Sequence, residues 1–321
     1  MSKFAGQWGA GLVFIALALI PALLGDSFFV FFLSSFFIFA MLTLSLQLLV
    51  GFAGILSLSH AAFFGIGAYC SAIMTVRYGV PFLLALPVAG VAAGIGGLLM
   101  SPIIRLREVY FAMASFAFGI VITEVFANWK SVTGGHDGFS MIPIAGLGPI
   151  DLDTPGKFYY LVLVLLAAQY LLYRQILASP FGRALNAMRQ NESGAKSAGL
   201  NLTALKIWAI LLAAVSAGIA GSLYAHLGGT VSPQMFHWSQ SITLLTMVVV
   251  GGASSTAGVF AGTFLLMFLT QYLRGFPEYS ALVNGLLLTL FVIFLPSGIG
   301  GLRLIRPLKR GGTVGSKSSP G

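Results

Sequence analysis

Few side chains in this chain combine a chemically useful type with a position inside an apolar run. Glu124 is the one acidic residue well inside such a run, and an ionised carboxylate at the bilayer centre costs at least about 2.5 kcal/mol on insertion scales. A buried acid of this kind usually marks a proton or cation site. Glu124 is expected near the outer membrane face, where it can reach water or pair with Lys130, and no second intramembrane acid accompanies it. We therefore do not expect proton-coupled transport.

Cysteine and histidine offer no catalytic or metal site. Cys70 is the single cysteine and lies inside an apolar run, which excludes a disulfide within the chain and leaves a zinc site without thiolate partners. The histidines lack the spacing of metal ligands, and we expect structural roles for His60, His136, His226 and His237. The sequence therefore gives no support to a disulfide, to cysteine chemistry or to a metal site.

The composition places the chain in a membrane. Only 8% of the 321 residues are charged and 58% are hydrophobic, whereas soluble domains carry about 25% charged residues. So few charges could not cover the surface of a soluble protein, but lipid accepts apolar side chains on every face of a helix. The net charge of +9 does not indicate a nucleic-acid partner, because the cations lie in short stretches between apolar runs.

Apolar runs long enough to cross a bilayer recur along the chain. A crossing helix needs about 20 apolar residues, and we expect an all-α, polytopic membrane protein of about ten transmembrane helices, some of them broken. The runs lie near residues 10–25, 28–50, 55–76, 82–104, 108–128, 158–177, 206–227, 240–253, 257–274 and 280–296. The first run is expected to stay as an uncleaved span rather than to act as a signal peptide.

Lysine and arginine residues predict the orientation, because cytoplasmic connections are rich in them. With the amino terminus inside, thirteen of the 17 basic residues face the cytoplasm and four face out. The inner set is Lys3, Arg105, Arg107, Arg174, Arg183, Arg189, Lys196, Lys206, Arg303, Arg306, Lys309, Arg310 and Lys317, and the outer set is Arg77, Lys130, Lys157 and Arg274. We expect cytoplasmic termini, a cytoplasmic loop at 178–205, an outer loop at 129–157, a single transmembrane domain at 1–304 and a disordered cytoplasmic tail at 305–321.

Small residues interrupt two apolar runs, at 51–54 and 251–258. Glycine lets helices pack closely in lipid, but unwound backbone within a membrane also occurs where it lines a substrate route, and both interpretations stay open. The segments "LVGFAGILS" and "VVGGASSTA" share a V-G-x-A pattern, compatible with an internal duplication. Candidate path residues are Gly51, Gly54, Ser57, Ser59, His60, Gly251 and Gly252. The polar ones among them could instead bond to one another and to nearby carbonyls.

One polar segment, "SPFGRALNAMRQNESGAKSAGLNLTALKIW" at 179–208, separates two apolar runs. Pro180 suits the first turn of a helix, and Ser193-Gly194 and Gly199 divide the segment into two short helices with a weakly amphipathic face. An ordinary solvated loop is the alternative. Because nearly every other cytoplasmic connection is very short, we favour a helix that lies against the membrane face and offers an apolar edge and charges to a soluble partner.

The same segment resembles the coupling loop of importer permeases of the ABC class. Residues 189–201 are similar to the form "R-x-N-E-x-A-A-x-x-x-G-I-N" of branched-chain amino acid permeases of the LivM and LivH type. The stretch "TGGHDGF" at 133–139 resembles the "T-G-G-x-D-G" loop of LivM-type subunits, and 212–262 resembles their glycine-rich helices. Departures such as Val259 in place of a proline, and Gly194 where alanine is common, leave the expected fold unchanged and the substrate less defined.

The resemblance implies a permease subunit that performs no catalysis and binds no cofactor. ATP and Mg²⁺ would be bound by two separate cytoplasmic ATP-binding subunits. A second, LivH-like permease in a heterodimer and a periplasmic substrate-binding protein would complete an importer in the bacterial inner membrane. Branched-chain or related hydrophobic amino acids are the expected substrates; urea, short amides or aromatic acids, or a stand-alone secondary transporter, are the alternatives. The residues that would couple to the ATPase are Gly182, Arg183, Arg189, Asn191, Glu192, Ala195, Gly199 and Leu200.

Overall fold

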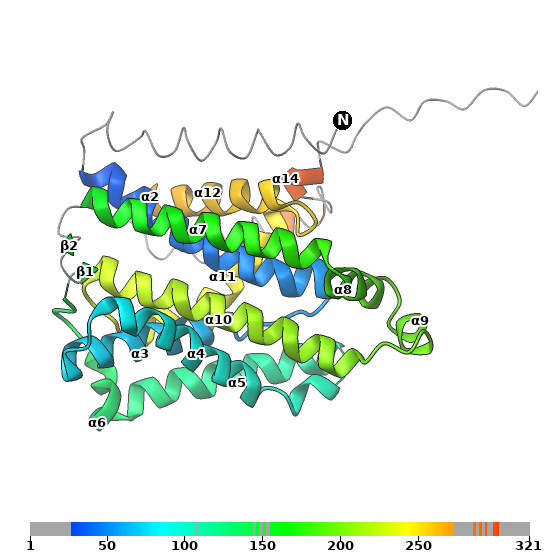
Figure 1. Cartoon of the computed structure of the whole chain (residues 1–321), viewed down its shortest axis with the longest axis horizontal. Coiled ribbons are helices and arrows are strands. Elements are labelled where there is room, and N and C mark those ends of the chain that lie inside the picture. Colours follow the sequence, from blue (N-terminus) through cyan, green and yellow to red (C-terminus); the bar gives the residue numbers. More distant parts are fainter. Residues whose placement is uncertain are drawn as a thin grey trace, which may run out of the picture.

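Long helices that lie side by side make up most of the protein (Figure 1). The computed structural model describes residues 27–106, 108–143, 146–147, 150–151, 155–272 and short pieces between 285 and 301. The helices are α2 (Ser27–Gln47), α3 (His60–Tyr78), α4 (Phe82–Leu99), α5 (Glu108–Asn128), α6 (Lys130–Thr133), α7 (Pro155–Ala178), α8 (Pro180–Gln190), α9 (Glu192–Ser197), α10 (Leu202–Gly228), α11 (Trp238–Gly251), α12 (Thr256–Tyr272) and α14 (Gly298–Gly301). The shorter elements are the π-helix η1 (Leu48–Ala53), the 3-10 helices η2 (Ile103–Arg105), η3 (Gly135–Asp137) and η4 (Pro233–Phe236), and the paired strands β1 (Gly146–Leu147) and β2 (Ile150–Asp151).

Five of the described helices are long and apolar enough to cross a membrane, namely Phe28–Ala53, Phe82–Leu99, Val109–Asn128, Gly156–Ala178 and Leu202–Gly228. The shorter apolar helices α11 and α12 pack against each other and against α2. About 20 apolar residues suffice to cross the hydrocarbon layer of a bilayer. The protein is therefore a multi-pass membrane protein.

α3 lies in the interior of the bundle, packed against α4 and α10. Glycine permits the close approach, because a Cβ on Gly67 would overlap the carbonyl oxygen of Gly218, and a Cβ on Gly221 would overlap that of Phe64. Small residues bring helices together in this way where no hydrophobic drive separates protein from lipid. Protein neighbours cover most of α3 as far as Thr75, whereas Val76–Tyr78 are exposed. This cover explains why the helix tolerates buried polar residues such as His60.

The described apolar helices coincide with predicted apolar runs, although only five of them are long and apolar enough to cross a membrane. Two runs differ from their helices at one end. The run near 82–104 is α-helical only as far as Leu99. The run near 55–76 was expected to be helical from its start, but α3 begins only at His60. Gly54 adopts a left-handed backbone conformation with φ +71°, and the residues between it and α3 are not helical. The run near 10–25 and the tail at 305–321 lie outside the described residues, as does most of the run near 280–296.

The predicted outer loop contains ordered structure where it is described. Phe139 and Val231 form an antiparallel bridge in which each backbone N–H donates to the carbonyl of the other at 2.8 Å. Arg77 donates to the carbonyl of Ser131 at 2.6 Å, and its guanidinium lies 5.2 Å from the centre of the Phe139 ring. The "TGGHDGF" motif is thereby held against the segment between α10 and α11.

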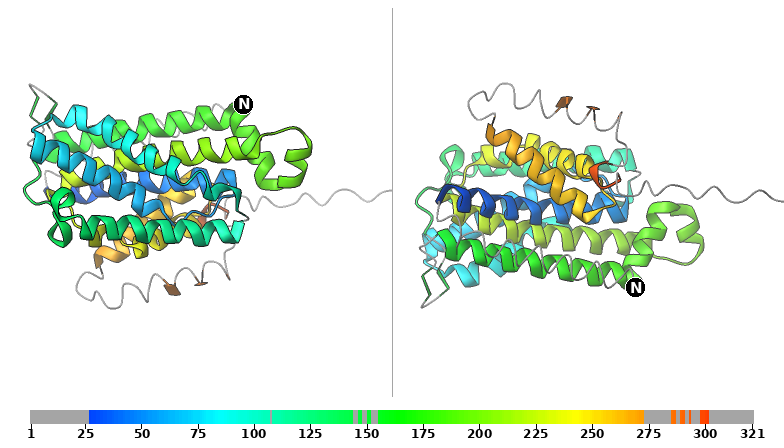
Figure 2. Two further views of the ribbon diagram at one scale, coloured as in Figure 1. Left: turned by 90° about the horizontal axis from the view of Figure 1, so that it is seen from below. Right: turned by 90° about the horizontal axis from the view of Figure 1, so that it is seen from above.

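The described basic residues gather at opposite ends of the bundle, in the grouping predicted from the sequence. Arg77 and Lys130 lie at the end that carries α6 and the β-hairpin of β1 and β2, which we term the β-hairpin end. Arg105, Lys196 and Lys206 line one cavity at the other end, where α9 projects from the bundle in all three views (Figure 2). We term this second end the α9 end.

Candidate functional site

The α8–α9 hairpin connects α7 to α10 at the α9 end (Figure 1). Ser179 caps α8 by accepting a hydrogen bond from the Gly182 N–H at 3.4 Å, and Pro180 occupies the first turn, where its missing N–H costs nothing. Gly182 lets α8 fold back on α7, since a Cβ there would overlap the carbonyl oxygen of Leu177. Leu185 is fully buried. The polar segment is therefore an ordered pair of helices docked on the bundle, not an irregular loop.

The boundary between α8 and α9 lies at Asn191, so the predicted division at Ser193-Gly194 was wrong. Asn191 has an extended backbone, and its side-chain Oδ1 accepts a hydrogen bond from the Gly194 N–H at 2.9 Å. This N-cap starts a new helix, and it places the serine and glycine within the first turn of α9. Gly199, with φ +82°, ends the hairpin as predicted, and Asn201 caps α10 in the same manner as Asn191 caps α9.

The predicted coupling residues are divided between the surface and the bundle. Ala195 is buried and Leu200 is half-buried, so α9 has one side against the protein. Arg183 is exposed and donates to the carbonyl of Ala178 at 3.1 Å, within the α7–α8 connection itself. Gly199 is exposed with nothing near the position of a Cβ.

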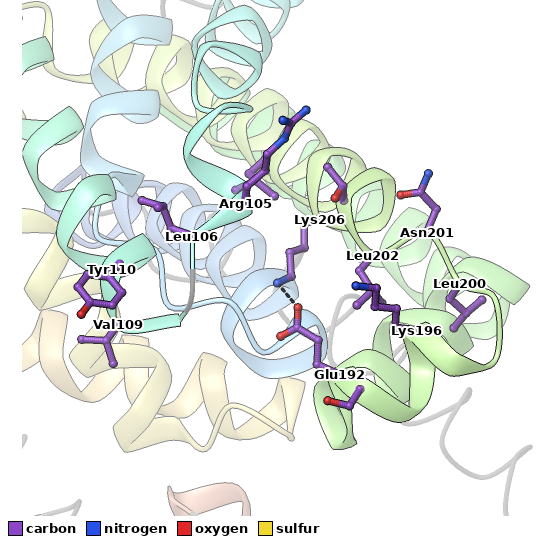
Figure 3. A pocket seen from close by; sticks show the side chains of 13 residues that line it. Arg105, Leu106, Val109, Tyr110, Glu192, Lys196, Leu200, Asn201, Leu202 and Lys206 are labelled. Atoms are coloured by element: carbon purple, nitrogen blue, oxygen red, sulfur yellow. Dashed lines mark hydrogen bonds and ion pairs between the residues drawn. The ribbon is translucent and has the colours of Figure 1, made fainter.

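A cavity of about 860 Å³ lies between α9 and the start of α5. Lys206 of α10 and Glu192 of α9 form an ion pair at 2.6 Å in its wall, and Figure 3 shows these two side chains pointing toward one another. The cavity is lined by Ile104, Arg105, Leu106, Val109, Tyr110, Glu192, Ser193, Lys196, Leu200, Asn201, Leu202, Thr203 and Lys206. With three cations and one anion the lining is net basic, and it contains both apolar and polar side chains.

Arg189 reaches from α8 to the first helix break. Its Nη1 donates a hydrogen bond to the carbonyl oxygen of Gly51, and a Cβ added to Gly54 would lie 3.1 Å from the Arg189 Cγ. A small cavity of about 40 Å³ beside this contact is lined by residues that include Gly54, Met188, Arg189 and Glu192. A predicted coupling residue and two predicted path residues thus meet, although they are far apart in the sequence.

Both glycine-rich stretches end a helix, and they lie side by side: the first connects η1 to α3 and the second connects α11 to α12. Gly54 turns the chain out of η1, and Gly252, with φ +91°, ends α11. A Cβ on Gly51 would overlap the carbonyl oxygen of Ala253. Gln47 donates to that same oxygen from Nε2 at 3.0 Å. The two V-G-x-A segments therefore adjoin one another at the α9 end.

The polar residues that follow the first break are buried and hydrogen-bonded within the bundle. The hydroxyl oxygens of Ser57 and Ser59 are 3.0 Å apart, and the Nε2 of His60 lies 2.7 Å from the Oγ of Ser45. Each of the three predicted residues is at most 1% exposed. In this conformation they belong to the interior of the bundle. Gly251 packs α11 against α12, because a Cβ there would overlap the backbone of α12.

Two residues of this region, Gln47 and Lys206, were not among the predicted site residues, although Lys206 was counted among the cytoplasmic cations. Gln47 is the polar residue one helical turn before the first glycine of an otherwise apolar run, and Lys206 is the cation in the first turns of an apolar span. Either position could have drawn attention. Glu124 is exposed, and its Oε2 accepts a hydrogen bond from the Nδ2 of Asn128 at 3.1 Å rather than pairing with Lys130.

Apolar helices able to span a membrane, two adjoining helix breaks and an ordered helical hairpin at one end define a polytopic membrane protein of the transporter class. The chain belongs to the family described as branched-chain amino acid transport system / permease component, whose sequence profile matches residues 28–293. This finding agrees with the motifs at 133–139 and 189–201.

Individual relatives place the chain within that family as a LivM-type permease. It is 34% identical over 308 residues to the high-affinity branched-chain amino acid transport system permease protein LivM of Escherichia coli K12, covering 88% of this chain and 72% of the relative. The LivM protein of Salmonella typhimurium LT2 is 35% identical with the same coverage. The probable LivM protein of Methanocaldococcus jannaschii is 26% identical, and the match covers 64% of both chains. No solved structure matches the chain significantly.

Proposed function

We propose that this protein is the permease subunit of an ABC importer for branched-chain or related hydrophobic amino acids, driven by separate ATPase subunits. In this scheme the permease has no catalytic role, and ATP and Mg²⁺ are bound by the partner subunits. Closure of those subunits on ATP displaces the α8–α9 hairpin, and the membrane helices respond by exchanging inward-open and outward-open states. Hydrolysis and release of ADP and phosphate then reset the cycle.

The observation that carries this proposal is the contact between the α8–α9 hairpin and the first helix break. A hairpin that docks on the bundle through Leu185 and Arg189 offers its α9 face and the basic cavity to a soluble partner. The two breaks lie beside this hairpin at the α9 end. Helix ends that adjoin in this way are usual near transport sites, because backbone that leaves the helix is tolerated there only when protein or a wet cavity surrounds it. The geometry thus supports a mechanical connection from cytoplasmic ATPase subunits to the membrane helices.

The complete importer in this proposal has four kinds of subunit: this permease, a LivH-like permease, two cytoplasmic ATP-binding subunits and a periplasmic substrate-binding protein. We place the α9 end and both termini in the cytoplasm of a bacterial cell and the β-hairpin end in the periplasm. The grouping of the described cations supports this orientation under the positive-inside rule. A similarity of 23% identity over 74% of the chain to the probable LivH protein of Methanocaldococcus jannaschii supports two membrane subunits of related fold.

The substrate assignment rests on the relatives named for branched-chain amino acid transport. An uncharged or zwitterionic ligand suits helix breaks built from glycine and serine. Permeation of urea, short amides or aromatic acids is the alternative within the family. Uptake competition with those compounds against leucine separates the two assignments.

The test is transport by the purified complex in proteoliposomes. The permease, a LivH-like permease, the ATPases and the binding protein are reconstituted, and ATP-dependent uptake of radiolabelled leucine is measured. Glu192→Ala, at the α9 surface, should lower both uptake and substrate-stimulated ATP hydrolysis while the permease still inserts. Glu124→Gln, an acidic-residue control at the other end, should leave both unchanged. A stand-alone secondary transporter would give a different result. Its uptake would not depend on ATP or change in the Glu192 variant, but it would be lost in the Glu124 variant or when the proton gradient is dissipated.

A further inference from the structure

We propose that Arg189 acts inside the permease, as a side-chain cap that ties α8 to the two helix breaks, and not as a contact to the ATPase. This inference rests on the proposed function, since a tie of this kind has a role only if the α8–α9 hairpin is moved by a partner. It reassigns one predicted coupling residue and adds Gln47 to the coupling apparatus.

The end of η1 has a backbone carbonyl that needs a hydrogen-bond donor from another element. The last carbonyls of a helix have no intrahelical partner. Here the N–H groups of Gly54 and Ile55 both donate to the carbonyl of Leu49, so the Gly51 carbonyl is left to another donor. Arg189 supplies it from Nη1. A cation at this position also opposes the partial negative charge that the aligned peptide dipoles of α2 and η1 place at the helix end.

The residues around that hydrogen bond are closely packed. Gly54 sits against the Arg189 side chain, where a Cβ would lie 3.1 Å from Cγ and 3.4 Å from the Arg189 Cα. Met188, the preceding residue of α8, is 3% exposed and lines the same small cavity as Gly54. Backbone and side chain of α8 therefore both rest on the turn that leaves η1, so the helix cannot shift without moving this turn or breaking the contact.

Contacts of Gly51 and Gln47 extend the connection to the second break. Gly51, whose carbonyl Arg189 holds, packs on Ala253 of the α11–α12 connection so closely that a Cβ would overlap the Ala253 carbonyl oxygen. Gln47 donates to that oxygen at 3.0 Å. Each break thus has one backbone carbonyl satisfied by a side chain from another element, and the two carbonyls adjoin. A displacement of α8 passes through Arg189 to both interrupted helices at once.

Arg183 provides a matched control within the same helix. It is also an arginine of α8 that donates to a backbone carbonyl, but its acceptor is Ala178, inside the α7–α8 connection. A variant at this position removes a similar charge and a similar hydrogen bond without touching either break. Differences between variants at the two positions therefore report on the connection to the breaks rather than on loss of positive charge.

The experiment compares Arg189→Gln and Arg183→Gln in the complete reconstituted importer. For each complex we measure the amount of ATPase that co-purifies with the permease, ATP hydrolysis with leucine-loaded binding protein, and leucine taken up per ATP hydrolysed. Arg189→Gln should retain ATPase and hydrolysis at wild-type levels but lose about tenfold or more in leucine per ATP. Arg183 keeps its predicted role as an ATPase contact, so Arg183→Gln should show the opposite pattern, with less co-purifying ATPase but little change in the leucine taken up per ATP. Arg189→Lys, which preserves one charged donor, should recover part of the ratio.

A second variant approaches the same contact from the membrane side. Gly54→Ala adds a methyl group against the Arg189 Cγ at a residue with φ +71°, and it should lower leucine per ATP as Arg189→Gln does. Loss of co-purifying ATPase in Arg189→Gln would make this residue a docking contact and overturn the inference, and so would a wild-type uptake ratio in both variants. Failure of the wild-type permease to retain any ATPase is a separate result, because it rejects the proposed function itself.

Discussion

Gly67 of α3 and Gly218 of α10 meet at a helix crossing where neither residue has room for a side chain: a Cβ on Gly67 would overlap the Gly218 carbonyl oxygen, and a Cβ on Gly218 would approach the Ala89 carbonyl at 2.7 Å. The obstacles at this crossing are backbone atoms and the Ala93 Cβ, which lies 2.4 Å from the Cβ position of Gly218, and neither can move aside as the end of a flexible side chain can. α10 packs against both α3 and α4, so this crossing fixes three helices relative to one another.

Gly67→Ala is therefore expected to destabilise the folded permease by about 1–3 kcal/mol, the usual cost of adding a methyl group to a tightly packed interior. The measurement is the midpoint of thermal or denaturant unfolding of the detergent-solubilised protein. Gly228→Ala is the control on α10, because no heavy atom lies within 4 Å of its Cβ position, and it should change stability by less than about 0.5 kcal/mol. Equal effects of the two variants would show that the crossing does not set the cost, because the change in helix propensity from glycine to alanine is favourable in both.

The Glu192–Lys206 ion pair is expected to contribute modestly to the position of α9. Its atoms are 2.6 Å apart, with the Lys206 side chain 16% and the Glu192 side chain 44% exposed, so solvent screens much of the attraction. A double-mutant cycle of Glu192→Ala and Lys206→Ala should give a coupling free energy of about 0.5–1 kcal/mol, which decreases as salt is added. Combining Glu192→Ala with Arg105→Ala across the same cavity should be close to additive, and comparable coupling in both cycles would argue for a diffuse field instead of a specific pair.

The helices were predictable from the sequence because lipid imposes a simple rule on them, a run of about 20 apolar residues. The breaks were predictable for a related reason, since glycine and serine stand out in such runs. The meeting of Gly51 with Ala253 was not, because 202 positions separate them in the printed sequence (253 − 51 = 202) and only packing brings them together. The start of α9 was misplaced because a capping side chain at Asn191 outweighed the composition of the two residues after Glu192.

Asn191→Ala is expected to loosen α9 without unfolding the bundle. The lost N-cap hydrogen bond, 2.9 Å from Oδ1 to the Gly194 N–H, is worth about 1 kcal/mol, which corresponds to about a fivefold rise in the opening of a short helix. Hydrogen exchange of the amides in 192–197 reports this opening directly. Asn191→Asp keeps an acceptor at the cap and should exchange at the wild-type rate. If the alanine variant also kept the wild-type rate, the cap would have no part in forming α9.

Gly138→Ala is expected to detach the "TGGHDGF" segment from the region before α11. Gly138 has φ +68°, and its Cβ would overlap the carbonyl oxygen of Val231, the same oxygen that accepts the Phe139 N–H in the bridge. The alanine should therefore break the bridge, seen as faster hydrogen exchange at the Phe139 and Val231 amides.

Gly135→Ala is the comparison variant for the effect of a positive φ. Gly135 has a similar φ of +71°, but its Cβ would meet the Lys130 Cγ at 2.9 Å, part of a flexible side chain that can move. Backbone strain at a positive φ costs about 1–3 kcal/mol, and Gly138 also has ψ −142°, a combination that glycine adopts far more readily than alanine. The additional loss in Gly138→Ala therefore measures the overlap with Val231 together with this backbone conformation. Equal loss in both variants would mean that the bridge tolerates the methyl group.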